Sequence, residues 1–364
     1  MKRRYQIIAV ILAIMLMATC CLAGCGQKDD SQPPATSSPA TQVIKDMAGR
    51  EHELPVQIDK VFSTSPVGTI MVYTINPDKL LGWNYELRED EKKYIPEKYH
   101  NLPNLGGWYG KATCNTEEVL KLKPDIILSM GDINEMALSQ ADQIEKQLGI
   151  PVIQVDGSLD KLGEAYTFMG KLLGEETKAA ELGTYCRQTV EDVQKKAGQV
   201  ADNKRVRVYY AEGAKGLETD PRGSMHTGVL DMVKGENVAE VVTKGGMGMT
   251  PVSMEQLLSW NPDLIICWGK AQGGYYENIF TDPNWQSIKA VKEKKVYAIP
   301  TTPYNWFDRP PSVNRIIGLK WLGNLLYPDL YKYDMAKETR EFYKKFYHYD
   351  LSDQEIASLL GSKR

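Results

Sequence analysis

The chain has 364 residues, of which 42% are hydrophobic and 25% are charged, and its formal net charge is −3 at pH 7. This length accommodates two domains of ordinary size, and the slightly acidic balance provides no basic surface for nucleic acid. The four histidines occur in no His-Glu-x-x-His motif, and the sequence has neither a nucleophile elbow nor a Walker-type phosphate loop. We therefore expect a protein that is not an enzyme.

The first residues have the pattern of an export signal. Residues 2–4 are basic, Ile7–Met17 is an unbroken apolar run, and Leu22-Ala23-Gly24-Cys25 is a small-residue cleavage site that ends in cysteine. Because this pattern resembles bacterial lipoprotein signals, we expect residues 1–24 to be removed and Cys25 to carry lipid. A transmembrane anchor is the alternative, since 17 uncharged residues at 7–23 reach the lower limit for spanning a bilayer.

The segment after the signal is polar and then gives way to an α/β pattern. Residues 25–42 are rich in Ser, Thr, Pro and Gln, which predicts a flexible tether behind the lipidated cysteine. Within 43–174, short apolar runs closed by turn residues indicate buried parallel strands. These runs are 61–63, 80–81, 126–130 and 152–155. We expect residues 43–174 to form an N-terminal α/β lobe.

A long helix is predicted to follow this lobe. Residues 175–200 contain good helix formers and little proline. An apolar stripe runs through this segment at Ala179, Leu182, Cys186, Val190 and Val193. We assign 175–202 as a connecting helix, which resists wide hinge motion between the parts that it joins.

Residues 114–132 and 252–270 are two versions of one sequence pattern. In each, a cap residue, Asn115 or Ser253, stands three positions before Glu or Gln, which is the capping-box spacing. A short helix then ends at a Pro-Asp pair, and an apolar strand closed by glycine follows. We expect Leu120 and Leu258 on the inward helix faces, together with Leu122 and Trp260.

The duplication predicts a second α/β lobe at 203–364, with strands at 206–210, 264–268 and 296–299. Two Rossmann-like lobes with mainly parallel sheets would enclose a ligand cleft at their strand ends. The mature chain keeps Cys114, Cys186 and Cys267, an odd number without a Cys-x-x-Cys pair, which indicates free, buried thiols.

Four motifs carry a resemblance to a known family. These are Asp46-Met-Ala-Gly-Arg-Glu, the segment Asn115–Asp125, Gly235-Glu-Asn-Val-Ala, and Trp306-Phe-Asp-Arg-Pro-Pro-Ser. Over about 43–347 the chain resembles periplasmic-binding-protein-like lipoproteins that feed iron–siderophore, haem and cobalamin ABC importers. The resemblance implies two lobes joined by one long helix. It also implies a monomer without a cofactor, lipid-anchored to the outer face of the bacterial cell membrane, that delivers its ligand to a permease and its ATPase.

The resemblance also implies a role for Glu117 and Glu255, which would project from the lobes and meet arginines of the permease. Both carboxylates lie in the first turn of a predicted helix, where favourable interaction with the helix dipole is the alternative explanation. Glu is present at this position in both copies, while the neighbouring positions differ.

Candidate ligand-binding residues come from loops and strand ends. The aromatic candidates are Trp83, Trp108, Tyr109, Trp268, Tyr304 and Trp306, and ordinary packing is the alternative for each. Arg222, Arg309 and Arg315 can hold an anionic chelate, although Asp308 can simply pair with Arg309. His226 can bind a metal directly, or serve only at a helix start or in packing.

These patterns predict capture of an iron–siderophore complex or a related metal chelate. Haem, a cobalamin-type corrinoid, or a metal oxyanion such as molybdate fits the same role. A cofactor-binding redox lipoprotein is the contrasting class, which a bound chromophore would distinguish.

Overall fold

The computed structural model describes residues 40–242 and 248–361. The expected signal peptide, Cys25 and most of the tether lie outside the described residues. Strand β1 already begins at Thr41, two residues inside the segment expected as tether. Within the described ranges, no helix combines the length and the apolar character needed to cross a bilayer.

An antiparallel hairpin of β1 (Thr41–Lys45) and β2 (Glu51–Pro55) opens the folded part. Asp46, in its turn, accepts hydrogen bonds from the Arg50 backbone at 2.9 Å and from the Gln154 backbone at 3.2 Å, and it contacts His52 at 3.1 Å. Burial alone would raise the pKa of Asp46, but these hydrogen bonds outweigh burial and lower the pKa to about 2. The Asp46 motif therefore fastens the hairpin to the first sheet.

Replacing Asp46 with Asn should lower the free energy of unfolding by about 2 kcal/mol at pH 7. The folded-state pKa lies below the unfolded value, so this stability is present above about pH 4 and is lost as the pH falls through about 2. Urea denaturation at pH 7, 4 and 3 measures the difference. If the difference in unfolding free energy between Asp46→Asn and the wild type is the same at all three pH values, the low pKa of Asp46 does not contribute to stability.

The first lobe contains a parallel sheet in the order β3-β4-β5. Its strands are β3 (Val61–Ser63), β4 (Ile126–Gly131) and β5 (Val152–Asp156). The predicted run at 80–81 is a single bridge from Leu80 to Val61 rather than a strand. The helices of this lobe are α2 (Pro66–Ile75), α3 (Glu89–Lys92), α4 (Thr116–Leu122), α5 (Glu135–Leu148) and α6 (Leu162–Leu173).

The second lobe repeats this arrangement in a parallel sheet of order β11-β10-β6-β8. Its strands are β6 (Arg207–Ala211), β8 (Glu236–Asn237), β10 (Leu264–Cys267) and β11 (Val296–Ala298). In the first lobe the order runs from the bridge at Leu80 through β3 and β4 to β5, and in the second it runs from β8 through β6 and β10 to β11. The duplication therefore extends to the topology of the two sheets. A small antiparallel pair, β7 (Glu218–Thr219) and β9 (Thr250–Pro251), accompanies it.

The duplicated helices α4 and α9 (Met254–Trp260) begin and end as the sequence predicts. The Asn115 and Ser253 side chains each accept a bond from a backbone N–H three residues on, at 3.2 Å in both cases. The residues that follow the helices, Lys123 and Asn261, adopt left-handed conformations just before the prolines. Only the second copy completes a capping box.

The aspartate after each proline has a structural task. Asp125 Oδ2 accepts the backbone N–H of Lys60 at 2.8 Å, and Asp263 Oδ2 accepts that of Arg207 at 3.1 Å. Because Lys60 and Arg207 stand at the start of β3 and β6, the Pro-Asp motif ties each duplicated unit to the first strand of its sheet.

The expected inward face of these helices was wrong at one position in each copy. Leu120 and Leu258 are 45% and 39% exposed, whereas Val119 and Leu257 are fully buried. Val119 and Leu257 are the side chains that each helix turns onto its sheet, and the next residue along each helix points away from it.

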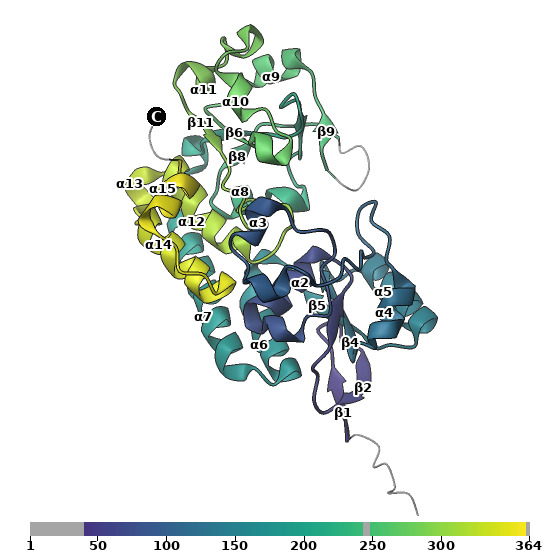
Figure 1. Cartoon of the computed structure of the whole chain (residues 1–364). Helices are drawn as coiled ribbons and strands as arrows, with labels where there is room; N and C mark the ends of the chain where they lie inside the picture. Colours follow the sequence, from purple (N-terminus) through teal and green to yellow (C-terminus); the bar gives the residue numbers. More distant parts are fainter. Residues whose placement is uncertain (1–39, 243–247, 362–364) are drawn as a thin grey trace, which may run out of the picture. The chain divides into compact units, whose positions relative to one another are not determined.

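The predicted connecting helix is α7 (Glu176–Ala197), and its apolar stripe is buried. It packs along α6 and also contacts α2 and α12 (Asn314–Leu326) (Figure 1). The other helices are α8 (Gly228–Met232), α10 (Tyr276–Ile279), α11 (Lys289–Lys292), α13 (Pro328–Tyr331), α14 (Met335–Phe342) and α15 (Asp353–Leu359).

The C-terminal segment returns to the first lobe. The Tyr73 hydroxyl on α2 donates to the Tyr347 carbonyl at 3.0 Å, and the rings of Tyr94 and Tyr343 meet edge to face at 5.5 Å. The expected C-terminal lobe at 203–364 therefore ends in residues that pack on both lobes. Cys114, Cys186 and Cys267 are free thiols. Cys186 and Cys267 are buried as expected, whereas Cys114 is only partly buried.

Candidate ligand-binding site

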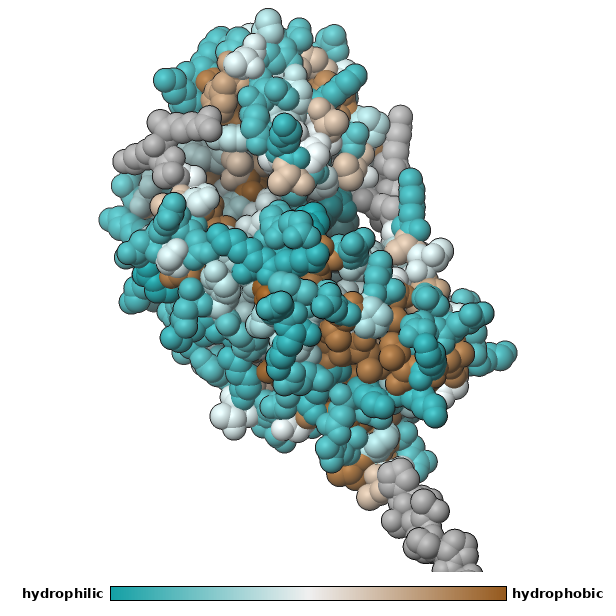
Figure 2. Space-filling view, in the orientation of Figure 1, coloured by the Kyte–Doolittle hydropathy of each residue, from teal (hydrophilic) through white to brown (hydrophobic). Residues whose placement is uncertain are grey.

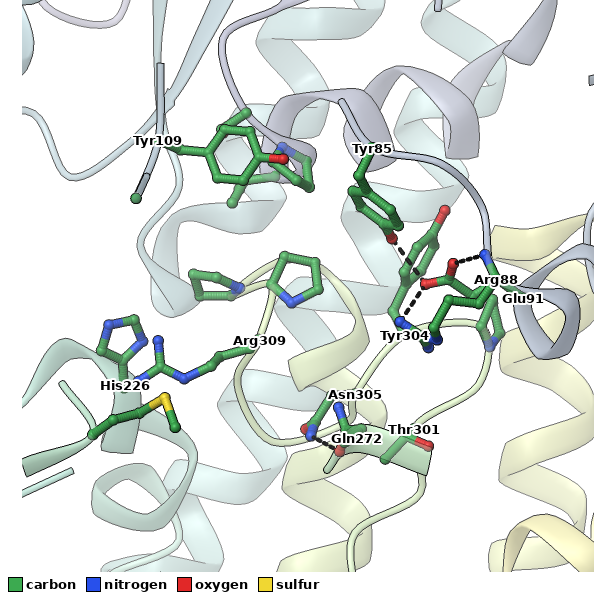
Figure 3. Close-up of a pocket in the computed structure, with 18 residues that line it drawn as sticks. Tyr85, Arg88, Glu91, Tyr109, His226, Gln272, Thr301, Tyr304, Asn305 and Arg309 are labelled. Atoms are coloured by element: carbon green, nitrogen blue, oxygen red, sulfur yellow. Dashed lines mark hydrogen bonds and ion pairs between the residues drawn. The ribbon is translucent and has the colours of Figure 1, made fainter. Parts of the chain in front are cut away.

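A cavity of about 620 Å³ is lined by residues from both lobes (Figure 3). Ser65 and Thr301 lie just past the ends of β3 and β11, because the carboxyl ends of parallel strands open onto one edge. From the first lobe come Ser65, Pro66, Val67, Tyr85, Arg88, Glu91, Tyr109 and Gly110. From the rest of the chain come His226, Met249, Gln272, Thr301, Pro303, Tyr304, Asn305, Arg309, Pro310 and Pro311.

One wall is organised around the buried carboxylate of Glu91. This carboxylate accepts the Tyr85 hydroxyl at 2.9 Å and the Arg88 backbone N–H at 2.8 Å, and the Arg88 guanidinium lies 3.0 Å away (Figure 3). Burial raises the pKa of Glu91, against these hydrogen bonds. The wall therefore presents the Tyr85 ring and a partly exposed arginine that already has a carboxylate partner.

Arg309 lines the cavity and pairs with a carboxylate cluster outside the lining, by which we mean Glu212, Asp220 and Asp308. Arg309 lies 3.2 Å from Glu212, 2.6 Å from Asp220 and 3.3 Å from Asp308, and all three carboxylates are fully buried. Burial and the neighbouring Asp220 raise the pKa of Glu212 to about 9, although Arg309 opposes this. Burial also raises the pKa of Asp308. One guanidinium thus faces three acidic groups, of which Glu212 keeps its proton at neutral pH.

His226 stands beside this cluster with its Nδ1 2.7 Å from an Asp308 oxygen. A carboxylate at Nδ1 favours the tautomer that leaves a lone pair on Nε2, the arrangement found for metal-binding histidines. Asp220, His226 and Asp308 place ligand atoms within 4.8 Å of one another, so the group is compatible with a metal ion. Arg309 already pairs with both aspartates, however, and an ion held by all three residues would compete with it.

Four of the sequence-predicted ligand residues line the cavity, namely Tyr109, His226, Tyr304 and Arg309. The Tyr109 hydroxyl donates to the Asn84 carbonyl at 2.9 Å. Tyr304 is almost completely buried, and its hydroxyl has no hydrogen-bond partner among the described residues.

The predicted tryptophans are not among the lining residues. Trp83 donates its indole N–H to the Tyr99 carbonyl at 2.8 Å, and Trp268 donates to the Tyr210 hydroxyl at 2.7 Å. Trp306 is fully buried, and Trp108 packs against Phe62. All four tryptophans therefore have the ordinary packing role that was the alternative for each. Large aromatic rings that lie next to a hydrophobic core are stabilised by burial in it.

Two predicted arginines also have internal partners. Arg222 donates to the Asn237 carbonyl at 3.0 Å and pairs with Glu240 at 2.8 Å. Arg315 donates to the Gly157 carbonyl at 2.9 Å, and burial lowers its pKa to about 10. Both lie outside the cavity lining.

Glu117 and Glu255 lie apart from the cavity, on the first turns of α4 and α9, and both are exposed. A hydrogen bond with its own backbone, helped by the Ser253 side chain, lowers the pKa of Glu255.

Tyr85, Arg88 and Glu91 were missed by the sequence reasoning because their segment carries no motif. Glu212 and Asp220 had a signal: the first follows a predicted strand, and the second lies in the loop leading to His226.

The family model for periplasmic binding proteins matches residues 87–303, more than half of the chain. The chain belongs to the periplasmic binding protein family. An ABC transporter solute-binding protein from Sulfurospirillum deleyianum superposes with a TM-score of 0.81 at 29% identity, covering 87% of this chain and 98% of that one.

Two relatives are similar over most of their length. The molybdate-binding protein MolA of Haemophilus influenzae is 26% identical, covering 85% of this chain and 92% of MolA. YvrC of Bacillus subtilis, an uncharacterised ABC transporter substrate-binding lipoprotein, is 26% identical, covering 91% of this chain and 100% of YvrC. The protein is therefore a substrate-binding protein of an ABC importer, a class that binds small ligands and works with a permease and an ATPase.

Proposed function

We propose that the ligand is a metal chelate with a large, partly apolar organic scaffold. The observation that carries this proposal is the cavity of about 620 Å³, whose lining includes three tyrosines, four prolines, valine and methionine. This volume equals the space of roughly twenty waters in the liquid. It falls in the range of sites for drug-sized ligands, which are lined mainly by apolar and aromatic groups.

Molybdate is the second candidate, favoured by the similarity to MolA. Two features of the cavity argue against it. A four-oxygen anion fills only a small part of the volume, and the arginines at the cavity are engaged with buried acids. Arg88 pairs with Glu91, and Arg309 pairs with the carboxylate cluster. A dianion would meet little uncompensated positive charge there.

Titration calorimetry on the purified protein tests the ligand class. The panel is a ferric catecholate siderophore, a ferric hydroxamate siderophore, haem, cyanocobalamin and molybdate. Calorimetry suits this site because no tryptophan is among the described residues that line the cavity and could report binding by fluorescence. We expect submicromolar binding of one chelate. Binding of molybdate alone, or of no chelate in the panel, would contradict the proposal.

In this proposal His226 completes the coordination of the metal that the chelate carries. Changing His226 to Gln should weaken binding of the chelate about 10- to 100-fold, the usual cost of disturbing a metal's ligand environment. It should also shift the absorption band of a ferric chelate. His100 to Gln is the matched control, because His100 Nε2 faces the Ile95 carbonyl at 2.6 Å, outside the cavity lining. If the two variants bind the chelate with equal affinity and give the same absorption spectrum of the bound ferric chelate, His226 does not bind the metal.

We also propose that Cys25 is lipidated and anchors the protein to the outer face of the cell membrane. The leader pattern and the similarity to the lipoprotein YvrC support this. Changing Cys25 to Ala should move the protein from the membrane fraction to the soluble fraction, since two acyl chains give stable anchoring. Retention of this variant in the membrane would point to an uncleaved apolar leader instead.

A further inference from the structure

The arginines at the cavity are already paired with acids of the protein. Arg88 and Arg309 are the only lysine or arginine side chains among the described residues that line it. The Arg88 guanidinium lies 3.0 Å from Glu91 and 3.1 Å from Asp90. The Arg309 guanidinium lies within 3.3 Å of every acid in the carboxylate cluster. Each cation that faces the cavity therefore has at least two acidic partners.

Among the described residues, the charges around these two arginines contain no positive excess. Five carboxyl groups of the described chain lie against the two guanidiniums, namely Asp90, Glu91, Glu212, Asp220 and Asp308. Burial raises the pKa of Glu212 to about 9 and also raises the pKa of Asp308. If both of these acids keep their protons, three carboxylates still face two guanidiniums.

Two neighbouring groups do not change this balance. A protonated His226 would be matched by the Asp308 carboxylate, which lies 2.7 Å from its Nδ1. Arg315 lies outside the lining, and the acids whose charges act on it are Asp308 and Asp132. An anionic ligand would therefore enter the cavity without surplus positive charge to compensate it, and burying an uncompensated charge is costly.

Neutral donors at the cavity are also engaged inside the protein. The Tyr85 and Tyr109 hydroxyls each donate to a protein oxygen at 2.9 Å, and the Asn305 amide donates to Gln272 at 3.0 Å. An anion would have to displace these hydrogen bonds in order to be solvated by them. The apolar parts of a ligand can instead pack against the tyrosine rings and the prolines of the lining.

The Glu91 carboxylate is held against Arg88 by two contacts. It accepts the Arg88 backbone N–H at 2.8 Å and also faces the guanidinium (Figure 3). The Glu91 side chain is 1% exposed, whereas that of Glu89, two residues earlier on α3, is 88% exposed. Figure 2 shows hydrophilic residues at the surface in the region that α3 occupies in Figure 1. The helix thus turns one acid inward beside the cavity and keeps another in solvent.

We infer that the cavity selects a chelate that is neutral or positively charged, and that Glu91 contributes to this selectivity by cancelling the charge of Arg88. The inference rests on the proposed chelate function and adds the charge of the chelate. Three hydroxamate groups neutralise a ferric ion, and cyanocobalamin is neutral overall. A ferric tris-catecholate is strongly anionic, and haem carries propionates. A site can exclude such anions by a charge that opposes them, without a contact to the ligand that it accepts.

A series of chelates that differ mainly in charge tests this rule. Ferrioxamine B ends in an ammonium group, its N-acetyl derivative is neutral, and its N-succinyl derivative ends in a carboxylate. Titration calorimetry of the full-length protein at pH 8 compares these three with cyanocobalamin, a ferric tris-catecholate and haem. The succinyl derivative should bind at least about tenfold more weakly than the other two ferrioxamines. The tightest binder of the whole panel should be neutral or cationic.

Replacing Glu91 with Gln should weaken this discrimination. The amide keeps an oxygen that can accept the Arg88 backbone N–H, but the change removes one of the two acidic charges beside the guanidinium. The ratio of anionic to neutral ferrioxamine affinity should rise about three- to tenfold, because the Arg88 charge is partly exposed and therefore partly screened. Glu89→Gln is the matched control. It removes the same charge from the same helix outside the cavity lining, and it should change the ratio less than twofold.

The outcomes separate this inference from the chelate proposal. If the succinyl derivative, the tris-catecholate or haem binds most tightly, the charge rule is wrong and the ligand is still a chelate. If the wild type prefers neutral chelates but Glu91→Gln and Glu89→Gln give the same ratio, Glu91 does not contribute to the preference. If no chelate in the panel binds, the chelate proposal fails and this inference falls with it. The melting temperature of Glu91→Gln shows whether that variant is folded, and the wild-type series decides the charge rule even if it is not.

Discussion

Replacing Arg309 with Met should lower the free energy of unfolding by about 3–5 kcal/mol at pH 8, the range measured when one partner of a buried ion pair is removed. Arg309 lies within 3.3 Å of Glu212, Asp220 and Asp308, whose side chains are fully buried. Methionine fills similar space but leaves these acids without their cation. The loss comes from uncompensated buried charge and exceeds the small contribution of a surface pair.

The pH dependence separates this mechanism from simple loss of packing. Without Arg309 the acids should hold protons more strongly in the folded state than in the unfolded chain. The deficit should therefore shrink as the pH falls from 8 to 5. Arg222→Met is the control: Arg222 is half exposed, and its loss should cost less than about 1 kcal/mol. Urea denaturation at pH 8 and pH 5 measures the unfolding free energy of each variant and of the wild type. If the loss caused by Arg309→Met is the same at both pH values, lost packing rather than uncompensated charge explains it.

Replacing Glu212 with Gln should flatten the dependence of stability on pH. Burial, with Asp220 nearby, raises the pKa of Glu212 to about 9 from an ordinary value of 4.5. Between these values the folded protein holds a proton that the unfolded chain releases. This group's contribution is therefore complete below about pH 4.5 and is lost as the pH rises towards about 9. The loss is at most about 1.4 kcal/mol per pH unit.

The substituted glutamine is neutral at every pH, and its side-chain oxygen can still accept the bond from Arg309 Nε. Relative to the wild type, the variant should gain stability steadily as the pH rises from 5 to 8. Glu240→Gln is the control, since Glu240 is largely exposed and lies on the surface beside Arg222. Denaturation curves at several pH values decide the matter. If the unfolding free energies of Glu212→Gln and of the wild type change with pH in the same way, Glu212 is ionised in the folded protein over this whole range.

Local sequence patterns predicted most of the architecture. The strands at 61–63, 126–131 and 152–156 and the helix α7 lie within a few residues of their predicted bounds, because apolar runs, caps and Pro-Asp ends are local signals. The duplicated pattern also predicted two lobes with matching sheets. The C-terminal contact with the first lobe was missed, because pairing such as that of Tyr73 with Tyr347 depends on residues far apart in sequence.

The site was predicted less completely, for a related reason. Position after a strand identified Tyr304 and Arg309, but it could not distinguish a ring that faces a cavity from one that completes a core, as Trp306 does. Periodicity could not show that Leu120 points outward, because exposure depends on which helix face meets the sheet. The carboxylate cluster gathers Glu212, Asp220 and Asp308 from three separate loops, and their meeting is a property of the fold.

Native mass spectrometry of the protein purified from the membranes of its native host tests the central claim most directly. The account predicts an adduct whose mass equals one metal ion plus an organic chelator, lost when the protein is unfolded and weakened by His226→Gln. Molybdate as the only bound species, at one equivalent and retained in His226→Gln, would contradict it.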